Sequence, residues 1–369
     1  MRVLIVTSTL DWLSVACLPQ ALQRVGLRCA VLAPRGCLAH LSRCVDLHDY
    51  LEADELRQPH SVGLLERACD RAEAQWVIPG DEHCTQWLAR IGLSLPEGAP
   101  LRALIWRSLG NPDAQGAVTD KLRAAGLAQE AGVAVPRTLV PASREDLLQL
   151  AIGLGGPVAL KCRTGYGGRN VFLCPDAAAL QRAAQQYRSP IPPVLQEMVS
   201  GTRWMSSFFA DRGRVLATID AVVERCNPSP TGPSSVLRIE PGGEVAASAA
   251  RLVAKLGYSG FGNIDFIVDR DGRACLLDFN PRLSAGTQLG RFAGPDPFAA
   301  FAAVLKGETY LAPPVRGGTR IALYPQELVR DPSGAGLAGC HHDVLEDEPG
   351  LHAEFEARIA RARAQAPGP

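Results

Sequence analysis

The stretch that most constrains the fold is residues 260–290, which read GFGNIDFIVDRDGRACLLDFNPRLSAGTQLG. Two runs with strand composition, 263–268 and 273–279, flank the dipeptide Asp271-Gly272. Asp-Gly is a strong signal for a two-residue hairpin loop, because both central positions of a type I′ turn need φ > 0. The stretch therefore predicts an antiparallel β-hairpin that turns at Asp271-Gly272.

A two-residue loop also fixes which residues face each other. It places Asp265 opposite Asp278, and Asn263 opposite Asn280, on one face of the hairpin. Side chains alternate between the two faces of a strand, so the other face is apolar. We expect that apolar face to consist of Ile264, Phe266, Val268, Cys275, Leu277 and Phe279.

Two carboxylates directly opposite each other destabilise a hairpin unless a cation compensates them. Carboxylate and amide oxygens suit Mg²⁺, which commonly uses one or two carboxylates together with substrate phosphates and water. Arg282, two residues after Asn280, would neutralise phosphate oxygens beside such a metal. The alternative is the solvated polar face of an ordinary hairpin. A calcium loop at 269–272 is ruled out, since no Glu closes it.

Composition excludes several classes of protein. The chain has 369 residues, enough for two or three packed units, and 38 basic residues balance 38 acidic ones. With no net charge there is no electrostatic case for nucleic acid or for an anionic membrane. Neither a signal peptide nor a membrane-spanning apolar run is evident, so we expect a soluble, cytoplasmic protein.

The 11 cysteines are scattered through apolar runs without a Cys-x-x-Cys pair, which indicates buried reduced thiols. Cys37, His40, Cys44 and His48 have zinc-like spacing but lack the paired spacing of structural zinc sites. We favour a helix face with small and polar residues for this segment.

The first part of the chain alternates strands with helices. Strands are expected at 2–7, 28–33 and 75–78, with helices at 14–25 and 61–74, which predicts a parallel sheet. The first turn lacks the Gly-x-Gly-x-x-Gly dinucleotide motif. The loop 79–82 follows a strand, and it is either part of a substrate site or an ordinary polar loop.

A glycine-rich loop lies between two short apolar strands at 157–173. Gly165, Gly167 and Gly168 would let the backbone approach an anion closely, and Lys161 on the entering strand would add a positive charge. The segment is not a P-loop. Alone it is weak evidence for phosphate binding.

Together these pieces resemble the ATP-grasp enzymes. Asn263-Ile-Asp-Phe followed by Asp278-Phe-Asn280-Pro-Arg282 is similar to their metal-binding end, with Asp in place of the usual Glu at 278. Upstream, the family's Asp-Lys helix, glycine loop and hinge strand occur in the family's order. Here that helix is expected to be capped by Thr119 and to end at Gly132.

The resemblance implies a role for each matching residue. It assigns the metal to Asp265, Asp278 and Asn280, and the nucleotide phosphates to Lys121, Lys161 and the glycine loop. Arg282 would act on the transferred phosphoryl, with Lys161 beside it. The hinge residues Glu197, Met198 and Val199 would bind the adenine edge. Arg203 stands where the family usually has an acidic ribose ligand, and the substrate residues would be Ser284, Gly286 and Asp81.

The resemblance also implies a fold of class α/β and α+β. We expect a Rossmann-like pre-ATP-grasp domain at 1–111 and a small lobe with the glycine loop at 112–193. A large lobe with the metal site would follow at 194–315, and a C-terminal extension at 316–369 would pack on the module.

The implied function is an ADP-forming carboxylate–amine ligase that uses ATP with Mg²⁺ or Mn²⁺. It would join an amino acid or a similar small carboxylate to an amine through an acyl phosphate. The alternatives are activation of bicarbonate, as in carboxylases or carbamoyl phosphate synthesis, and a nucleotide-binding regulator without chemistry. The expected partners are small-molecule substrates, with no nucleic acid and no membrane, and a homodimer is compatible with this reading.

Overall fold

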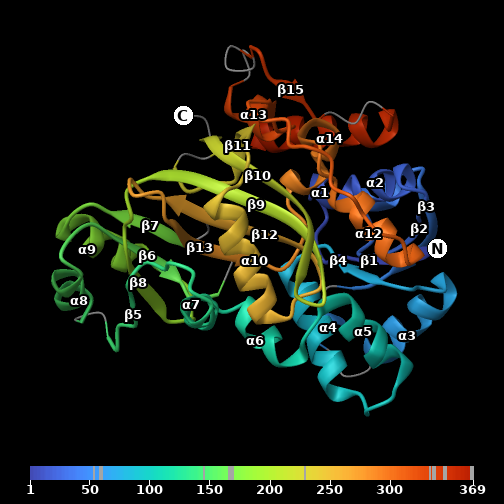
Figure 1. Cartoon of the computed structure of the whole chain (residues 1–369), viewed down its shortest axis with the longest axis horizontal. Helices are drawn as coiled ribbons and strands as arrows, with labels where there is room; N and C mark the ends of the chain where they lie inside the picture. The colour runs from blue at the N-terminus through green and yellow to red at the C-terminus, as the bar shows by residue number, and fades with distance from the viewer. Residues whose placement is uncertain are drawn as a thin grey trace.

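The structure is a computed structural model that describes residues 1–52, 55–57, 61–143, 146–164, 170–227, 230–331, 334, 338–343 and 347–365, with side chains up to 361. Three sheets organise these residues (Figure 1). The parallel first sheet and the two mainly antiparallel ones confirm the expected α/β and α+β class.

The first sheet has the strand order β3-β2-β1-β4, and all of its pairs are parallel. Its strands are β1 (Arg2–Val6), β2 (Arg28–Ala33), β3 (Val45–Tyr50) and β4 (Val77–Pro79). The helices of this part are α1 (Leu13–Ala16), α2 (Leu18–Arg24), α3 (Ser61–Ala72), α4 (Glu82–Ser94) and α5 (Pro100–Leu109). The expected parallel sheet is therefore present.

The segment with zinc-like spacing forms a 3₁₀ turn and the edge strand β3, so the expected helix face is wrong. β3 has no buried residue, and its apolar pattern is correspondingly weak. His40 Nδ1 and His48 Nδ1 lie 3.1 Å apart. Within the described part of the chain, no three His, Cys, Asp or Glu side chains group around a metal position.

The small sheet is antiparallel, with the order β5-β8-β6-β7. It contains β5 (Thr138–Leu139), β6 (Val158–Cys162), β7 (Val171–Cys174) and β8 (Pro193–Glu197), and it packs against α8 (Asp146–Leu154) and α9 (Ala177–Gln186). The hinge strand β8 belongs to this sheet, and the chain passes from it into the large sheet.

The large sheet has the order β13-β12-β9-β10-β11-β14-β15 and is antiparallel except at β14–β15. Helix α10 (Glu244–Leu256) packs on one of its faces, and its end is the left-handed Gly257. The strands are β9 (Thr202–Asp211), β10 (Arg214–Cys226), β11 (Ser234–Ile239), β12 (Gly260–Val268), β13 (Ala274–Asn280), β14 (Arg320–Ala322) and β15 (His341–His342); α6 (Gln115–Val118), α7 (Lys121–Glu130), α11 (Gly290–Ala293) and α12 (Pro297–Lys306) complete the module.

Helix α12 joins the first sheet to the large sheet. Phe301 of this helix is fully buried, and its ring lies 5.4 Å from that of Trp76 and 5.1 Å from that of Phe209. One apolar cluster thus contains residues of the N-terminal sheet, of α12 and of β9. The two units share a core rather than meeting through a polar contact.

The C-terminal segment packs against the beginning of the chain as well as on the large sheet. Helix α14 (Pro349–Gln365) buries Leu351 and Phe355 against Leu13 and Leu38, and the carboxylate of Glu348 accepts a 2.5 Å hydrogen bond from Ser42. The short helix α13 (Gln326–Arg330) lies between β14 and this region in sequence.

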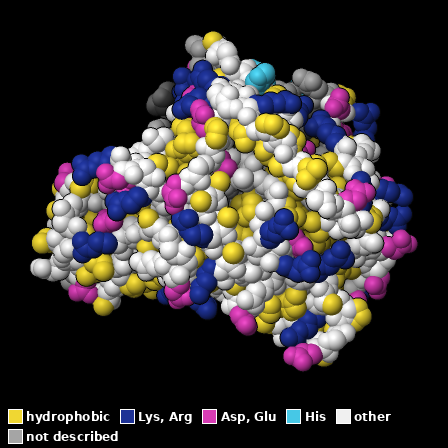
Figure 2. Space-filling model, in the orientation of Figure 1, with side chains coloured by type: hydrophobic (Ala, Val, Ile, Leu, Met, Phe, Trp, Pro, Cys, Tyr) yellow, Lys and Arg dark blue, Asp and Glu magenta, His cyan; other side chains and the backbone are white. Residues whose placement is uncertain are grey.

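Charges are mixed over the molecular surface. Basic and acidic side chains are interspersed over the face in Figure 2, without a large patch of one sign. In the part of the chain that the structure covers, no helix combines the length and apolar character that crossing a membrane requires.

Candidate active site

The hairpin β12–β13 pairs Asn263 with Asn280 and Asp265 with Asp278, as expected. Its turn differs from the expected type I′ turn. Asp269 N–H donates to Arg273 O, and only Gly272 has a positive φ of 79°. The loop therefore has three residues, with glycine at the left-handed position. A β-bulge after Asp265 restores the expected register at the polar end.

The bulge also changes which residue is in the core. Phe266 pairs with Leu276, so Leu277 is the extra residue of the bulged strand. Leu276 is buried in the cluster with Ile264, Phe266 and Phe279, whereas Leu277 is only partly buried. The expected apolar face was therefore wrong at Leu277 and correct for most of β12.

The polar face of the hairpin gathers two carboxylates and an amide. Asn280 Nδ2 donates to Asp265 Oδ2 at 3.3 Å. Burial raises the pKa of Asp265, although Arg203 acts in the opposite direction. Lys121 Nζ donates to Asp278 Oδ1 at 2.5 Å. Two facing, partly buried carboxylates are therefore present at the expected positions.

Lys121 is the first residue of α7, and the side chain of Asp120 caps this helix. Asp120 accepts hydrogen bonds from Leu122 N and from Arg163 Nε. The expected cap Thr119 was one residue too early. The Asp120–Arg163 ion pair fixes the start of α7 against β6, and sequence reasoning missed it because Arg163 lies 43 residues away.

Lys161 lies on β6, and its Nζ donates to Gln196 Oε1 at 2.6 Å. Burial, followed by the charge of Lys121, lowers the pKa of Lys161 to about 8. The two lysines therefore approach the carboxylate pair from two different elements. Gly165, Gly167 and Gly168 of the expected glycine loop lie outside the described residues.

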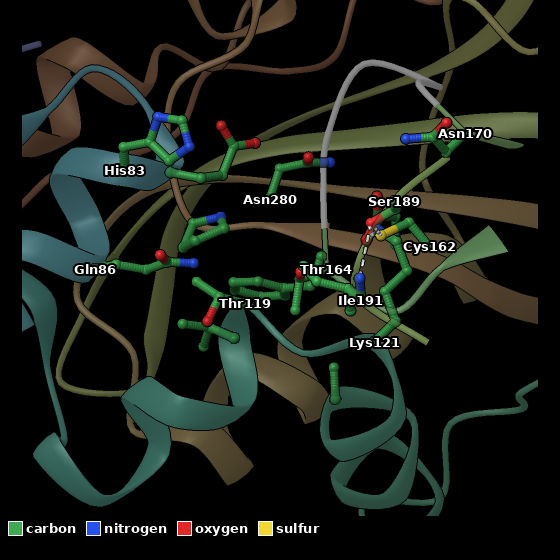
Figure 3. Close-up of a pocket in the computed structure, with 16 residues that line it drawn as sticks. His83, Gln86, Thr119, Lys121, Cys162, Thr164, Asn170, Ser189, Ile191 and Asn280 are labelled. Carbon is green, nitrogen blue, oxygen red and sulfur yellow. Dashed lines mark hydrogen bonds and ion pairs between the residues drawn. The ribbon is translucent and has the colours of Figure 1, made fainter. Parts of the chain in front are cut away.

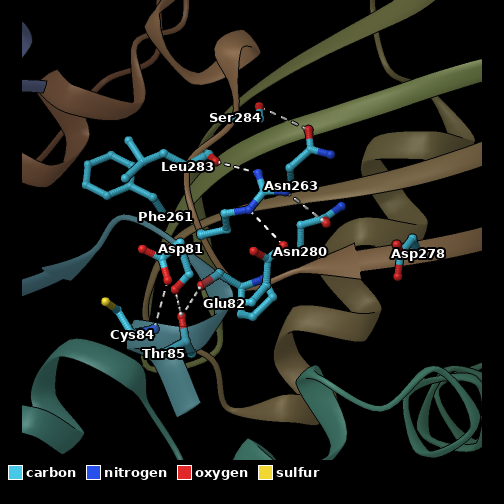
Figure 4. A network of polar contacts seen from close by, with 12 residues as sticks. Asp81, Glu82, Cys84, Thr85, Phe261, Asn263, Asp278, Asn280, Leu283 and Ser284 are labelled. Carbon is cyan, nitrogen blue, oxygen red and sulfur yellow. Dashed lines mark hydrogen bonds and ion pairs between the residues drawn. The ribbon is translucent and has the colours of Figure 1, made fainter. Parts of the chain in front are cut away.

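Arg282 lies between the large sheet and the N-terminal unit. Its Nε donates to Glu82 Oε1 at 2.8 Å, and its guanidinium carbon lies 4.7 Å from the ring centre of Trp12. Thr85 Oγ1 donates to Pro281 O at 3.0 Å beside it. Figure 4 shows Glu82 and Asn280 in the same network of polar contacts. Glu82 belongs to the loop 79–82, which was expected to be either part of a substrate site or an ordinary polar loop, and no sequence motif pointed to Trp12.

The three expected substrate residues have different surroundings. Asp81 caps α4 and accepts from Thr7, Ser8 and Cys84, so protein donors engage both of its oxygens. Ser284 Oγ lies 2.7 Å from Ser207 Oγ, in a polar cluster with Asn263. Gly286 packs so tightly that an added Cβ would lie 2.2 Å from Met205 Cε.

Two backbone N–H groups at the hinge already donate hydrogen bonds within the protein. Glu197 N donates to Arg137 O, and Met198 N donates to Pro157 O at 3.0 Å. Val199 follows in a non-regular segment. Arg203, on β9, donates from Nη1 to Gly232 O at 3.2 Å and lies close enough to Asp265 and Lys161 to influence both pKa values.

A cavity of about 370 Å³ is lined by some of these groups, whereas Asp265, Lys161 and Arg282 are not among its lining residues. Its lining includes Lys121, Asp278 and Asn280, and Glu82, His83 and Gln86 of α4. In Figure 3, His83 and Gln86 lie on one side, Lys121 lies on the opposite side, and Asn280 lies between them. Thr164 and Asn170, at the two ends of the glycine loop, also line it. The cavity thus lies where the small sheet, the large sheet and helix α4 of the N-terminal unit contribute residues.

Comparison with known proteins identifies the central module. Residues 118–286 match the family model of the ATP-grasp domain. This segment, somewhat less than half of the chain, is therefore similar to an ATP-grasp domain. Asp265, Asp278, Asn280 and both lysines lie within these bounds, whereas Glu82 and Trp12 lie before them.

Curated relatives match about half of the chain or less. A chloroplastic biotin carboxylase of Arabidopsis thaliana is 27% identical over 188 residues, which cover 47% of this chain and 35% of that protein. A biotin carboxylase of a Nostoc strain is 31% identical over 193 residues, covering 47% of this chain and 42% of the relative. The chain therefore spans well under half the length of these relatives.

Solved structures extend the likeness to most of the chain. N5-carboxyaminoimidazole synthase from Aspergillus clavatus, in complex with ADP and 5-aminoimidazole ribonucleotide, matches with a TM-score of 0.67 at 14% identity, covering 87% of this chain and 81% of that one. The biotin carboxylase domain of a Hydrogenobacter thermophilus 2-oxoglutarate carboxylase matches with a TM-score of 0.64 at 15% identity, covering 86% and 73%. At these identities the likeness shows that the fold is shared.

Proposed function

We propose that the chain is an ATP-dependent, ADP-forming carboxylate–amine ligase that acts through an acyl phosphate. The observation that carries the proposal is the polar face of β12–β13, where Asp265, Asp278 and Asn280 face the ammonium groups of Lys121 and Lys161. Carboxylates that face each other destabilise a hairpin unless a cation compensates their charge, and such a pair can bind a metal ion together with phosphates.

The donor set fits Mg²⁺, with Mn²⁺ as the alternative. Two carboxylates and an amide are too few for an all-protein cage, and Mg²⁺ usually completes such a set with substrate phosphates and water. Asp265, Asp278 and Asn280 would hold the ion. When bound, it would neutralise charge on the transferring phosphoryl group.

The other residues act directly on the substrates. Lys121 and Lys161 bind and orient the nucleotide phosphates, and Arg282 stabilises charge on the phosphoryl group or on the acyl phosphate. Glu82 and Trp12 hold the Arg282 guanidinium in place. Ser284 and Gly286 border the carboxylate substrate, and the hinge 197–199 borders the adenine.

Bicarbonate is the second candidate for the carboxylate. This candidate is favoured by the relatives, which include biotin carboxylases and a carbamoyl phosphate synthase large chain, and by a neighbouring structure that contains bicarbonate with MgADP. In both versions the carboxylate oxygen attacks the γ-phosphorus and ADP leaves, so the site residues keep the same roles.

A screen of ADP release tests the proposal. Proteinogenic amino acids and bicarbonate serve as carboxylates, and amino acids and simple amines as acceptors, with ATP and MgCl₂. We expect at least one pair to accelerate ADP release in the wild type. Release that depends on bicarbonate alone would select the second candidate, and no dependence on any carboxylate would contradict ligase activity.

Asp278→Ala and Asn280→Ala should each abolish the stimulated ADP release, because each removes a metal ligand from the polar face. Neither side chain belongs to the apolar cluster of the hairpin, so circular dichroism and the melting temperature should stay near those of the wild type. Wild-type turnover in either variant would contradict the metal assignment.

A further inference from the structure

Glu82, the first residue of α4, combines burial with incomplete hydrogen bonding. Its side chain is 12% exposed, and Oε1 accepts the 2.8 Å bond from Arg282. Oε2 is buried and has no hydrogen-bond partner among the described residues. A buried polar atom without a hydrogen-bond partner destabilises the folded state, and a charged one does so more strongly. Glu82 Oε2 can therefore accept a hydrogen bond from a bound molecule.

The place of Glu82 in the cavity indicates what that donor is. Glu82 lines the cavity together with its α4 neighbours His83 and Gln86, and Asp278 and Lys121 line it as well. Lys121 lies across the cavity from His83 and Gln86 in Figure 3. Arg282, which contacts Glu82, lies two residues beyond Asn280 of the metal face. A molecule that entered between α4 and an acyl phosphate held at Arg282 would meet the Glu82 carboxylate.

We propose that Glu82 forms the acceptor subsite and takes a proton from an amine nucleophile. The inference rests on the proposed ligase function and narrows its second substrate to an amine that carries N–H groups. An anion at the same place would face the charge of Glu82. Burial, the largest influence, raises the pKa of Glu82 and so makes this carboxylate a better proton acceptor.

The proton balance of the step is complete. An acceptor bound as an ammonium gives one proton to Glu82, which frees the nitrogen lone pair. The lone pair attacks the acyl phosphate carbon, the C–N bond forms, and the C–O bond to phosphate breaks with its electron pair on the phosphate. The second proton of the nitrogen goes to that phosphate, and the product is an amide.

Glu82→Gln tests the role, because glutamine keeps an oxygen for Arg282 but is neither charged nor basic. The matched control is Glu327→Gln: Glu327 is a buried carboxylate that pairs with Arg225 and Arg330 and does not line the cavity. The two nucleophile probes are methylammonium, which must lose a proton, and hydroxylamine, which is largely a neutral amine near pH 7. Both are offered with the carboxylate that the ADP screen identifies.

We expect Glu82→Gln to lower kcat/KM for methylammonium by about a hundredfold, the low end of general-base contributions. Trapping of the acyl phosphate by hydroxylamine should stay near wild type, and Glu327→Gln should leave the ratio of the two rates unchanged. Equal losses with both nucleophiles would show that Glu82 acts only by holding Arg282, and no loss with either would also overturn the inference.

A binding measurement keeps the subsite testable without turnover. Methylammonium chloride should raise the melting temperature of the MgADP complex in the wild type and in Glu327→Gln, but not in Glu82→Gln. Tetramethylammonium chloride, which has no N–H group, should have no such effect on any of them. If methylammonium does not raise the melting temperature of the wild type, or raises that of Glu82→Gln equally, the acceptor subsite is overturned. The ligase function fails by a different result, which is ADP release that does not depend on any carboxylate.

Discussion

At the scale of single residues, charge compensation organises the site. Asp278 is paired with Lys121, Arg282 is paired with Glu82, and the buried Asp265 lies near Arg203. The site residues include four cations, Lys121, Lys161, Arg203 and Arg282, and three carboxylates. This excess of positive charge suits a polyphosphate. Among these residues Lys161 has a pKa that burial, the largest influence, lowers to about 8.

The lowered pKa of Lys161 therefore predicts that kcat/KM for ATP depends on pH. The pKa of Lys161 is lowered to about 8, so its ammonium is present below that pH and is lost as the pH rises through it. We expect kcat/KM for ATP to fall above pH ~8, approaching tenfold per pH unit, because kcat/KM reports the free enzyme. Lys161→Arg keeps its charge over this range and should move the decline to higher pH. An unchanged profile in Lys161→Arg would show that another group causes the decline.

At the scale of elements, the hairpin shows both what sequence could predict and where it failed. The facing of Asp265 and Asp278 was predicted through a two-residue loop, yet the structure has a three-residue loop and a bulge that offset each other. A bulge leaves no local signal in the sequence here, so Leu277 was placed in the core instead of Leu276.

Other elements and residues that the sequence did not predict were missed for similar reasons. The edge strand β3 lacks buried residues, and helix α4 begins at the polar loop 79–82, so neither stood out by apolar pattern. The two lysines and the polar face of the hairpin could be singled out from the sequence because each belongs to a motif with local spacing, and their roles stay a prediction. Glu82 and Trp12 reach Arg282 across some 200 residues or more, and no spacing rule links them. The division into ranges at 111, 193 and 315 stays a prediction.

The bulge predicts an asymmetry between neighbouring leucines. Leu276→Ala should lower the free energy of unfolding by about 2–5 kcal/mol, because it leaves a cavity in the cluster beneath α10. Leu277→Ala should cost clearly less, since Leu277 is only partly buried. Urea denaturation of the two variants measures the difference, and a larger loss at Leu277 would contradict the bulged register.

At the scale of the whole molecule, the N-terminal sheet and the large sheet share one core through α12. Trp76, Phe209 and Phe301 belong to three different parts of the chain and lie within 5.1–6.0 Å of each other, ring centre to ring centre. Such packing fixes the position of α4, and therefore of Glu82, relative to the polar face of the hairpin β12–β13.

The shared core predicts cooperative unfolding of the two units. Phe301→Ala should destabilise the chain by about 3–5 kcal/mol and lower the midpoints of both units together. Phe292→Ala, at a partly buried ring, is the control and should cost less. Unfolding followed by far-UV circular dichroism and by tryptophan fluorescence checks this, and two separate transitions in the wild type would contradict a common core.

The central claim is that the site transfers the γ-phosphoryl group to a carboxylate oxygen. The most direct measurement uses the carboxylate identified in the ADP screen, labelled with ¹⁸O in its carboxyl group, and analyses the nucleotide and phosphate by mass spectrometry. An acyl phosphate predicts ADP as the nucleotide product and ¹⁸O in the released phosphate, since the C–O bond to the transferred oxygen breaks when the amine attacks. AMP with pyrophosphate, or phosphate without label, would contradict it.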